Sequence, residues 1–108
     1  MKSIRNKVTL VGNLGSNPEI TNFESGKKMV RFSLATNEEI RAINGKTTTI
    51  TEWHRIIGWG QFAKYMEDYG QKGKQFAIIG KKVNRNYKTK AGQPREITEI
   101  EINSIVGI

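Results

Sequence analysis

The chain is organised around one stretch, Thr51-Glu52-Trp53-His54-Arg55-Ile56-Ile57-Gly58-Trp59-Gly60. Its β-branched and aromatic residues are typical of a strand that ends at the last glycine. Side chains alternate along a strand, so Trp53, Arg55 and Trp59 are expected on one face. Two indoles about 20 Å apart with a cation between them suit an extended, stacked polyanion. Single-stranded nucleic acid offers both base faces and phosphates, so this pattern favours it as the partner.

The same pattern allows a second interpretation, in which both tryptophans belong to the hydrophobic core. Tryptophan on a strand of a small domain is commonly buried. In that arrangement Arg55 would be buried without an evident partner, which is costly. Periodicity alone leaves both interpretations open.

Composition limits the class of protein. The chain has 108 residues, 36% of them hydrophobic, which predicts one globular domain over residues 1–108. It contains no cysteine, which excludes disulfides, thiolate metal sites and a thiol nucleophile. Its first residues lack the apolar segment typical of a signal peptide, and no apolar run in the sequence is long enough to span a membrane. We therefore expect a cytoplasmic protein with no membrane partner.

Positive charge is concentrated in one part of the chain. The net charge is +8, and eight basic residues without any acidic residue lie between Tyr69 and Arg95. Charge gathered in this way is typical of a surface that binds a polyanion. A lysine-rich solubilising surface is the alternative. An anionic membrane is less favoured because the stretch is not an amphipathic helix.

The order of the elements predicts an all-β fold with one short helix. Strands are expected at residues 4–14, 29–36, 51–60, 75–87 and 97–105, with a short extended piece around Ile20. Asn44-Gly45 predicts a type I′ turn that joins the second and third strands in one long hairpin. Aromatic residues at helical spacing predict a helix at residues 61–69, packed on the core and ended by Gly70 or Gly73. This is the order of a five-stranded OB-fold, a Greek-key barrel with long hairpins.

Several motifs in this order resemble the bacterial single-stranded DNA-binding protein family. They are Val11-Gly12-Asn13-Leu14-Gly15, Pro18-Glu19, Phe32-Ser33-Leu34-Ala35-Thr36, Thr51-Glu52-Trp53-His54-Arg55 and Lys72-Gly73. Together they extend the resemblance from residue 6 to residue 105. The resemblance implies an OB-fold homotetramer, associated with the nucleoid, that coats and protects single-stranded DNA in replication, recombination and repair.

The resemblance also implies roles for particular residues. Trp53, Trp59 and Tyr87 lie at positions where the family stacks bases, whereas Ile40 replaces a tryptophan that some members have. The cations expected to contact phosphates are Arg55, Lys72, Lys81, Lys82, Arg85, Lys88 and Lys90. Family members usually continue into a flexible tail with an acidic tip that recruits replication and repair proteins. This chain stops at Ile108, so we expect either a protein that does not recruit partners in this way or a shortened chain.

No enzymatic site, cofactor or metal is predicted. The only histidine, His54, lies on the strand face opposite the tryptophans, and a lone histidine is more often structural. The pairs Glu38-Glu39 and Glu67-Asp68 form no recognisable acid/base dyad or metal site. The open alternatives are an OB-fold nuclease, a dimeric tail-less adaptor of replication restart and an RNA-binding OB module. Stacking grooves do not distinguish the sugars of RNA and DNA.

Overall fold

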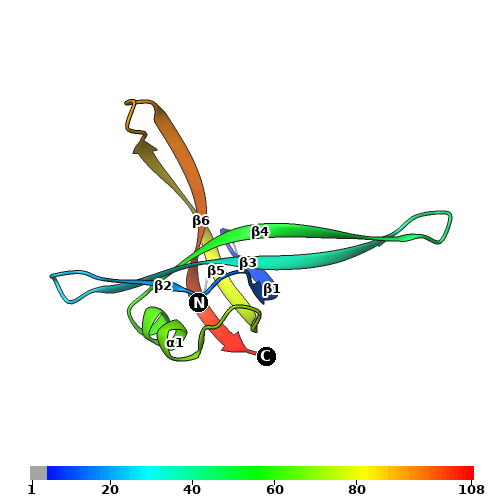
Figure 1. Cartoon of the computed structure of the whole chain (residues 1–108), viewed down its shortest axis with the longest axis horizontal. Helices are drawn as coiled ribbons and strands as arrows, with labels where there is room; N and C mark the ends of the chain where they lie inside the picture. The colour runs from blue at the N-terminus through cyan, green and yellow to red at the C-terminus, as the bar shows by residue number, and fades with distance from the viewer. Residues whose placement is uncertain (1–4) are drawn as a thin grey trace.

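A computed structural model describes residues 5–108 and contains a closed five-stranded β-barrel (Figure 1). The sheet order is β1-β5-β6-β4-β3-β2, and a further pairing between β1 and β3 closes the barrel. The short β2 pairs only with β3 and lies outside it. The elements are β1 (Val8–Leu14), β2 (Glu19–Asn22), β3 (Lys28–Arg41), β4 (Thr47–Trp59), α1 (Gln61–Tyr69), β5 (Gln75–Lys88) and β6 (Pro94–Gly107). The predicted OB-fold is therefore confirmed, and the helix has the predicted bounds.

The core consists of the inward faces of the barrel strands, closed at one end by α1. On β3 the alternating residues Val30, Phe32 and Leu34 are all buried, as expected for one face of a strand. The helix contributes Ala63 and Met66 to this core, with the other core residues coming from Leu14, Ile56, Phe76, Ile78, Ile100 and Ile102. One expectation for the helix is wrong, because Tyr69 is 55% exposed at its last turn.

Three hairpins project beyond the barrel and give the molecule its branched outline (Figure 1). The longest joins β3 to β4, with paired residues from Met29 and Trp59 to Arg41 and Thr47. The β5–β6 hairpin remains paired as far as Lys88 and Pro94, and the β2–β3 hairpin is the shortest. Since only the base of each hairpin belongs to the barrel, the distal parts are exposed ribbons that can meet a ligand.

The turn of the β3–β4 hairpin differs from the predicted type I′ turn. Ala42 N–H donates to the Lys46 carbonyl at 2.8 Å. The Ala42 carbonyl accepts a hydrogen bond from Gly45 N–H at 2.9 Å. Only Gly45 has a positive φ, of 82°, whereas a type I′ turn also requires a positive φ at the residue before it. This three-residue loop recurs in the β2–β3 hairpin with Gly26 and in the β5–β6 hairpin with Gly92.

The strand ends differ from the predicted ones for reasons of pairing. β1 begins at Val8, and the predicted start at residue 4 lies outside the described residues. The extended piece around Ile20 is a true strand, β2, because it pairs with β3. β6 runs from residue 94 to residue 107, longer than predicted, since β5 supplies partners along its whole length. The register shifts where Ile79 faces Ser104 and Gly80 faces Ile102. No helix in the described part of the chain is long and apolar enough to cross a membrane.

Candidate nucleic-acid interface

The two tryptophans lie on the outer face of the barrel. Trp53 is 63% exposed and Trp59 is 39% exposed, whereas Ile56, on the opposite face of β4, is 1% exposed. Arg55 is also exposed and lies between them in the strand, as alternation predicts. The interpretation of both tryptophans as core residues is therefore wrong. The cost of burying Arg55 without a partner had favoured an exposed face, and the structure agrees.

Trp53 is held against the backbone of the loop that follows β1. A Cβ atom placed on Gly15 would lie 2.2 Å from Cζ3 of the indole, so only glycine fits there. On β3, the small residue Ala35 faces Trp53 in the ladder, and the Trp53 side chain remains largely exposed. In the sequence, Gly15 stood out only as the last residue of the motif Val11-Gly12-Asn13-Leu14-Gly15. Its contact with the indole explains why a glycine is needed at this point.

Trp59 makes an aromatic contact with the β2–β3 hairpin. Its ring stacks on Phe23 with centroids 6.0 Å apart and planes 24° from parallel. A shallow depression of about 380 Å³ lies beside it, lined by Trp59, Gly60 and residues 26–28. Phe23 could not be recognised from the sequence, because one aromatic residue beside a turn has no periodic pattern.

A groove forms where β4 and β6 separate. These strands pair in parallel only at Ile56 with Ile100 and at Ile57 with Glu101. Beyond these pairs they continue into different hairpins (Figure 1). The opening of about 260 Å³ is lined by three arginines and two carboxylates, among other residues: Arg31, Arg55, Arg85, Glu19 and Glu99. A second depression continues it along Arg55 to Trp53, with Glu96, Ile97 and Thr98 opposite. The groove therefore connects the cations with the first indole.

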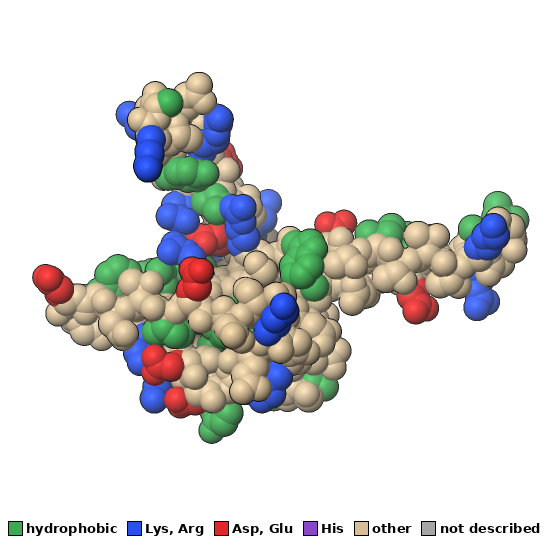
Figure 2. Space-filling model, in the orientation of Figure 1, with side chains coloured by type: hydrophobic (Ala, Val, Ile, Leu, Met, Phe, Trp, Pro, Cys, Tyr) green, Lys and Arg blue, Asp and Glu red, His purple; other side chains and the backbone are tan. Residues whose placement is uncertain are grey.

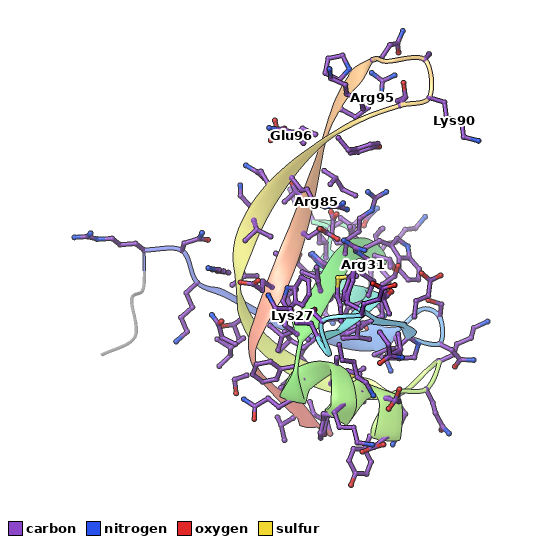
Figure 3. All side chains as sticks on the ribbon, turned by 90° about the vertical axis from the view of Figure 1, so that its left-hand side faces the viewer. Lys27, Arg31, Arg85, Lys90, Arg95 and Glu96 are labelled. Atoms are coloured by element: carbon purple, nitrogen blue, oxygen red, sulfur yellow. The ribbon has the colours of Figure 1, made fainter. Side chains whose placement is uncertain are left out.

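The charges of this groove are fixed by one buried carboxylate. Glu99 is 3% exposed. Its Oε2 accepts a hydrogen bond from Arg31 Nε and its Oε1 one from Arg85 Nε, both at 3.1 Å. Figure 3 shows Arg31 and Arg85 labelled close together below the β5–β6 hairpin. In both arginines, the terminal nitrogens Nη1 and Nη2 form no hydrogen bond or ion pair with the described residues. These nitrogens therefore remain available to an anion. Arg31 was not among the predicted cations, and no local sequence pattern indicates that it meets Glu99, 68 positions away.

The basic stretch is distributed over more than one surface. Arg85 and Tyr87 share one face of β5, and Tyr87 is 46% exposed. Lys82 and Lys88 project from the other face, because strand side chains alternate. Lys81 is in an ion pair with Glu101 at 3.4 Å. Figure 2 shows basic side chains along the β5–β6 hairpin and around its base.

Two predicted cations lie at the ends of this region. Lys90 is in the turn of the β5–β6 hairpin, where Figure 3 labels it. Lys72 lies in the loop after α1, and its backbone N–H donates to Asn17 Oδ1 at 2.9 Å. This bond places Lys72 beside the 15–18 loop that carries Gly15. Of the predicted cations, Arg55 and Arg85 thus line the groove and Lys72 flanks it.

The other polar residues have structural partners. His54 is half-buried, with Nε2 2.9 Å from Thr36 Oγ1 on the neighbouring strand. Glu67 and Asp68 pair with Lys28 and Lys64, and the hydrogen bond to Asp68 raises the pKa of Lys64. Residues 5–108 contain no group of three potential metal ligands. Ile40 is 46% exposed on the distal β3–β4 hairpin, on the strand face opposite Trp53 and Ala35.

Comparison with known proteins identifies the family. The model of the single-strand binding protein family matches residues 5–107. A curated relative, single-stranded DNA-binding protein 1 of Chlorobaculum tepidum, is 41% identical over 96 residues. The match covers 88% of this chain but 59% of the relative, so the chain spans about three-fifths of that protein's length.

Two solved structures share the architecture. The Plasmodium falciparum SSB complex with ssDNA has a TM-score of 0.85 and 34% identity, covering 100% of this chain and 97% of the other. A deletion mutant of the single-stranded DNA binding protein from Thermus aquaticus has a TM-score of 0.82. At 20% identity, covering 95% of this chain and 50% of the other, that likeness shows the fold alone. The chain belongs to the single-strand binding protein family.

Proposed function

We propose that this protein binds single-stranded DNA without sequence preference and so coats and protects it in replication, recombination and repair. One observation carries this proposal: Trp53 and Trp59 are exposed on the same face of β4 with Arg55 between them. Exposed indoles offer stacking surfaces to any base, since every base has a π-face. The related Plasmodium falciparum protein was solved in complex with ssDNA.

The groove supplies the electrostatic part of the interaction. Arg55, Arg85 and Arg31 line the opening between β4 and β6, within reach of a strand that stacks on Trp53. Arginine binds phosphate oxygens with its planar fork of donors. Tyr87, on the face of β5 that carries Arg85, offers a third stacking surface on the β5–β6 hairpin. Lys72, Lys81, Lys82, Lys88 and Lys90 add longer-range attraction from the flanks.

We also propose that the protein works as a homo-oligomer, with a tetramer as the expected state. The edge of β1 at residues 8–12 has no strand partner opposite β5 among the described residues, because β3 pairs only with Asn13 and Leu14. An unpaired edge readily pairs with another strand. The adjoining outer face is apolar, with Val11 50% and Val106 58% exposed. A second copy could pair with the edge and cover this face.

In the proposed function the protein binds DNA and is not an enzyme, in agreement with its family. It is expected to act in the cytoplasm, at the nucleoid. Replication and repair proteins would bind it through an acidic tail if the full-length protein has one. The adaptor of replication restart is less favoured, since the exposed tryptophans suit direct coating of DNA.

The test is a titration of tryptophan fluorescence with oligo(dT), with duplex DNA and oligo(U) as competitors. Binding should quench the fluorescence in a saturable way, and duplex DNA should compete poorly. Better competition by oligo(U) than by oligo(dT) would assign the site to RNA instead. Light scattering on the same samples measures the oligomeric state.

A further inference from the structure

The outer face that carries the tryptophans continues onto the β2–β3 hairpin. In the β3 ladder Met29 faces Trp59 and Thr21, and all three lie on this outer face. Phe23, two residues after Thr21 and directly after the end of β2, lies on the same face, where its ring stacks on Trp59. Phe23 is 42% exposed, so part of its ring remains accessible. The aromatic surface therefore extends beyond β4.

A cation lies directly across the hairpin from Phe23. Phe23 N–H donates to the Lys27 carbonyl at 2.9 Å, so the two residues are opposite each other and their side chains share a face. Lys27 is exposed and forms no ion pair within residues 5–108. The next residue, Lys28, projects from the other face, where its Nζ lies 2.7 Å from Glu67 Oε1. Two neighbouring lysines thus differ in whether they can reach a ligand on the outer face.

The basic residues of the outer face connect this hairpin with the central groove. Figure 3 looks towards the β2–β3 hairpin and labels Lys27, Arg31 and Arg85 in order from this hairpin to the base of the β5–β6 hairpin. Glu24, in the β2–β3 turn itself, is acidic. Aromatic and positive side chains thus reach Phe23 and Lys27, past Glu19, which faces Arg31, and Glu24 follows in the turn.

We propose that the β2–β3 hairpin is a further binding subsite for the single strand, in which a base stacks on Phe23 and a phosphate contacts Lys27. The inference rests on the proposed function and extends the DNA path past Trp59. The base lies on the open part of the Phe23 ring rather than between the two rings, because the rings already stack on each other. One more stacked base and one more phosphate are thereby bound per protomer.

The experiment measures the affinity of the full chain for labelled oligo(dT) of about 16 nucleotides, long enough to follow the whole path. Phe23→Ala should weaken binding by about five-fold or more. About five-fold is the lower end of the range expected for the loss of one stacked base. Phe23→Tyr keeps a ring and should bind as the unaltered protein does. Lys27→Gln should reduce the slope of log K against log salt by about 0.7, and the matched control Lys28→Gln should leave it unchanged.

A second variant separates direct stacking from support of Trp59. If Phe23 contacts a base, Phe23→Ala should weaken binding by the same factor in a Trp59→Ala background. If Phe23 only orients the indole, its loss should have no effect in that background, and this result would overturn the subsite. Thermal unfolding verifies that each variant is folded.

The results also separate this inference from the proposed function. If the unaltered chain binds oligo(dT) and both Phe23→Ala and Lys27→Gln bind equally well, the strand does not reach the hairpin. That outcome overturns the subsite and leaves the proposed function intact. If the unaltered chain does not bind oligo(dT), the proposed function fails and the subsite fails with it.

Discussion

Replacement of Trp53 by alanine should weaken DNA binding much more than it alters the fold. Stacking of one base on an aromatic side chain contributes about 1–3 kcal/mol, so Kd should rise by about 5- to 150-fold. Trp53 is 63% exposed, so its remaining contacts bury only about 80 Å² of its surface. At about 25 cal/mol per Å², that burial contributes about 2 kcal/mol at most to the free energy of unfolding.

The assay is fluorescence anisotropy of labelled oligo(dT), because it does not depend on the missing indole. Trp53→Phe keeps an aromatic ring and should retain most of the affinity. Ile56→Ala is the matched control on the same strand: Ile56 is 1% exposed, so its loss should lower the free energy of unfolding by about 2–5 kcal/mol. The folded fraction of that variant should still bind. Wild-type affinity of Trp53→Ala would show that the indole does not stack on DNA.

Three further substitutions probe the neighbouring parts of the site. Gly15→Ala should displace the Trp53 indole, since the new Cβ would lie 2.2 Å from Cζ3, and should weaken binding about as much as Trp53→Ala does; unchanged affinity would mean that this packing is dispensable. Glu99→Gln should lower the free energy of unfolding by about 1–3 kcal/mol, because two arginines lose the charge of their shared acceptor. The same change should raise the affinity for DNA at low salt, because the groove becomes more positive. Weaker DNA binding by the folded variant would refute the proposed electrostatic role of the groove. Val11→Asp should reduce the oligomer mass in light scattering, and an unchanged mass would place the subunit contact elsewhere.

The fold was predictable where local pattern and burial agree. Alternation on β3 indicates the buried face correctly, and helical spacing locates α1 and its contact with the core except at Tyr69, which is exposed at the last turn. Strand ends were less predictable, since pairing with a partner strand decides them. β6 extends to residue 94 only because β5 supplies a partner there. The type of turn at Asn44-Gly45 depends on the length of the hairpin loop, and the dipeptide alone does not determine that length.

The candidate site was predictable in part. Alternation predicted that Trp53, Arg55 and Trp59 share one face of β4 but left open whether that face is buried. The cost of burying an unpaired arginine favoured exposure, which the structure shows. The contacts between elements distant in sequence did not follow from any periodic pattern. Glu99 meets Arg31 across 68 positions, and Phe23 reaches Trp59 through the folding of the β2–β3 hairpin. The compact basic stretch is divided between two faces of β5, which local charge density could not reveal.

The most direct test of the account is titration of the tryptophan fluorescence of the unaltered chain with oligo(dT) at two salt concentrations. We expect saturable quenching and an affinity that falls as salt rises, with a slope of about −0.7 for each phosphate neutralised. Quenching should persist at the higher salt, since stacking on Trp53 and Trp59 does not depend on counterion release. Unchanged fluorescence and no binding at either salt concentration would contradict the claim that this outer face binds a single strand.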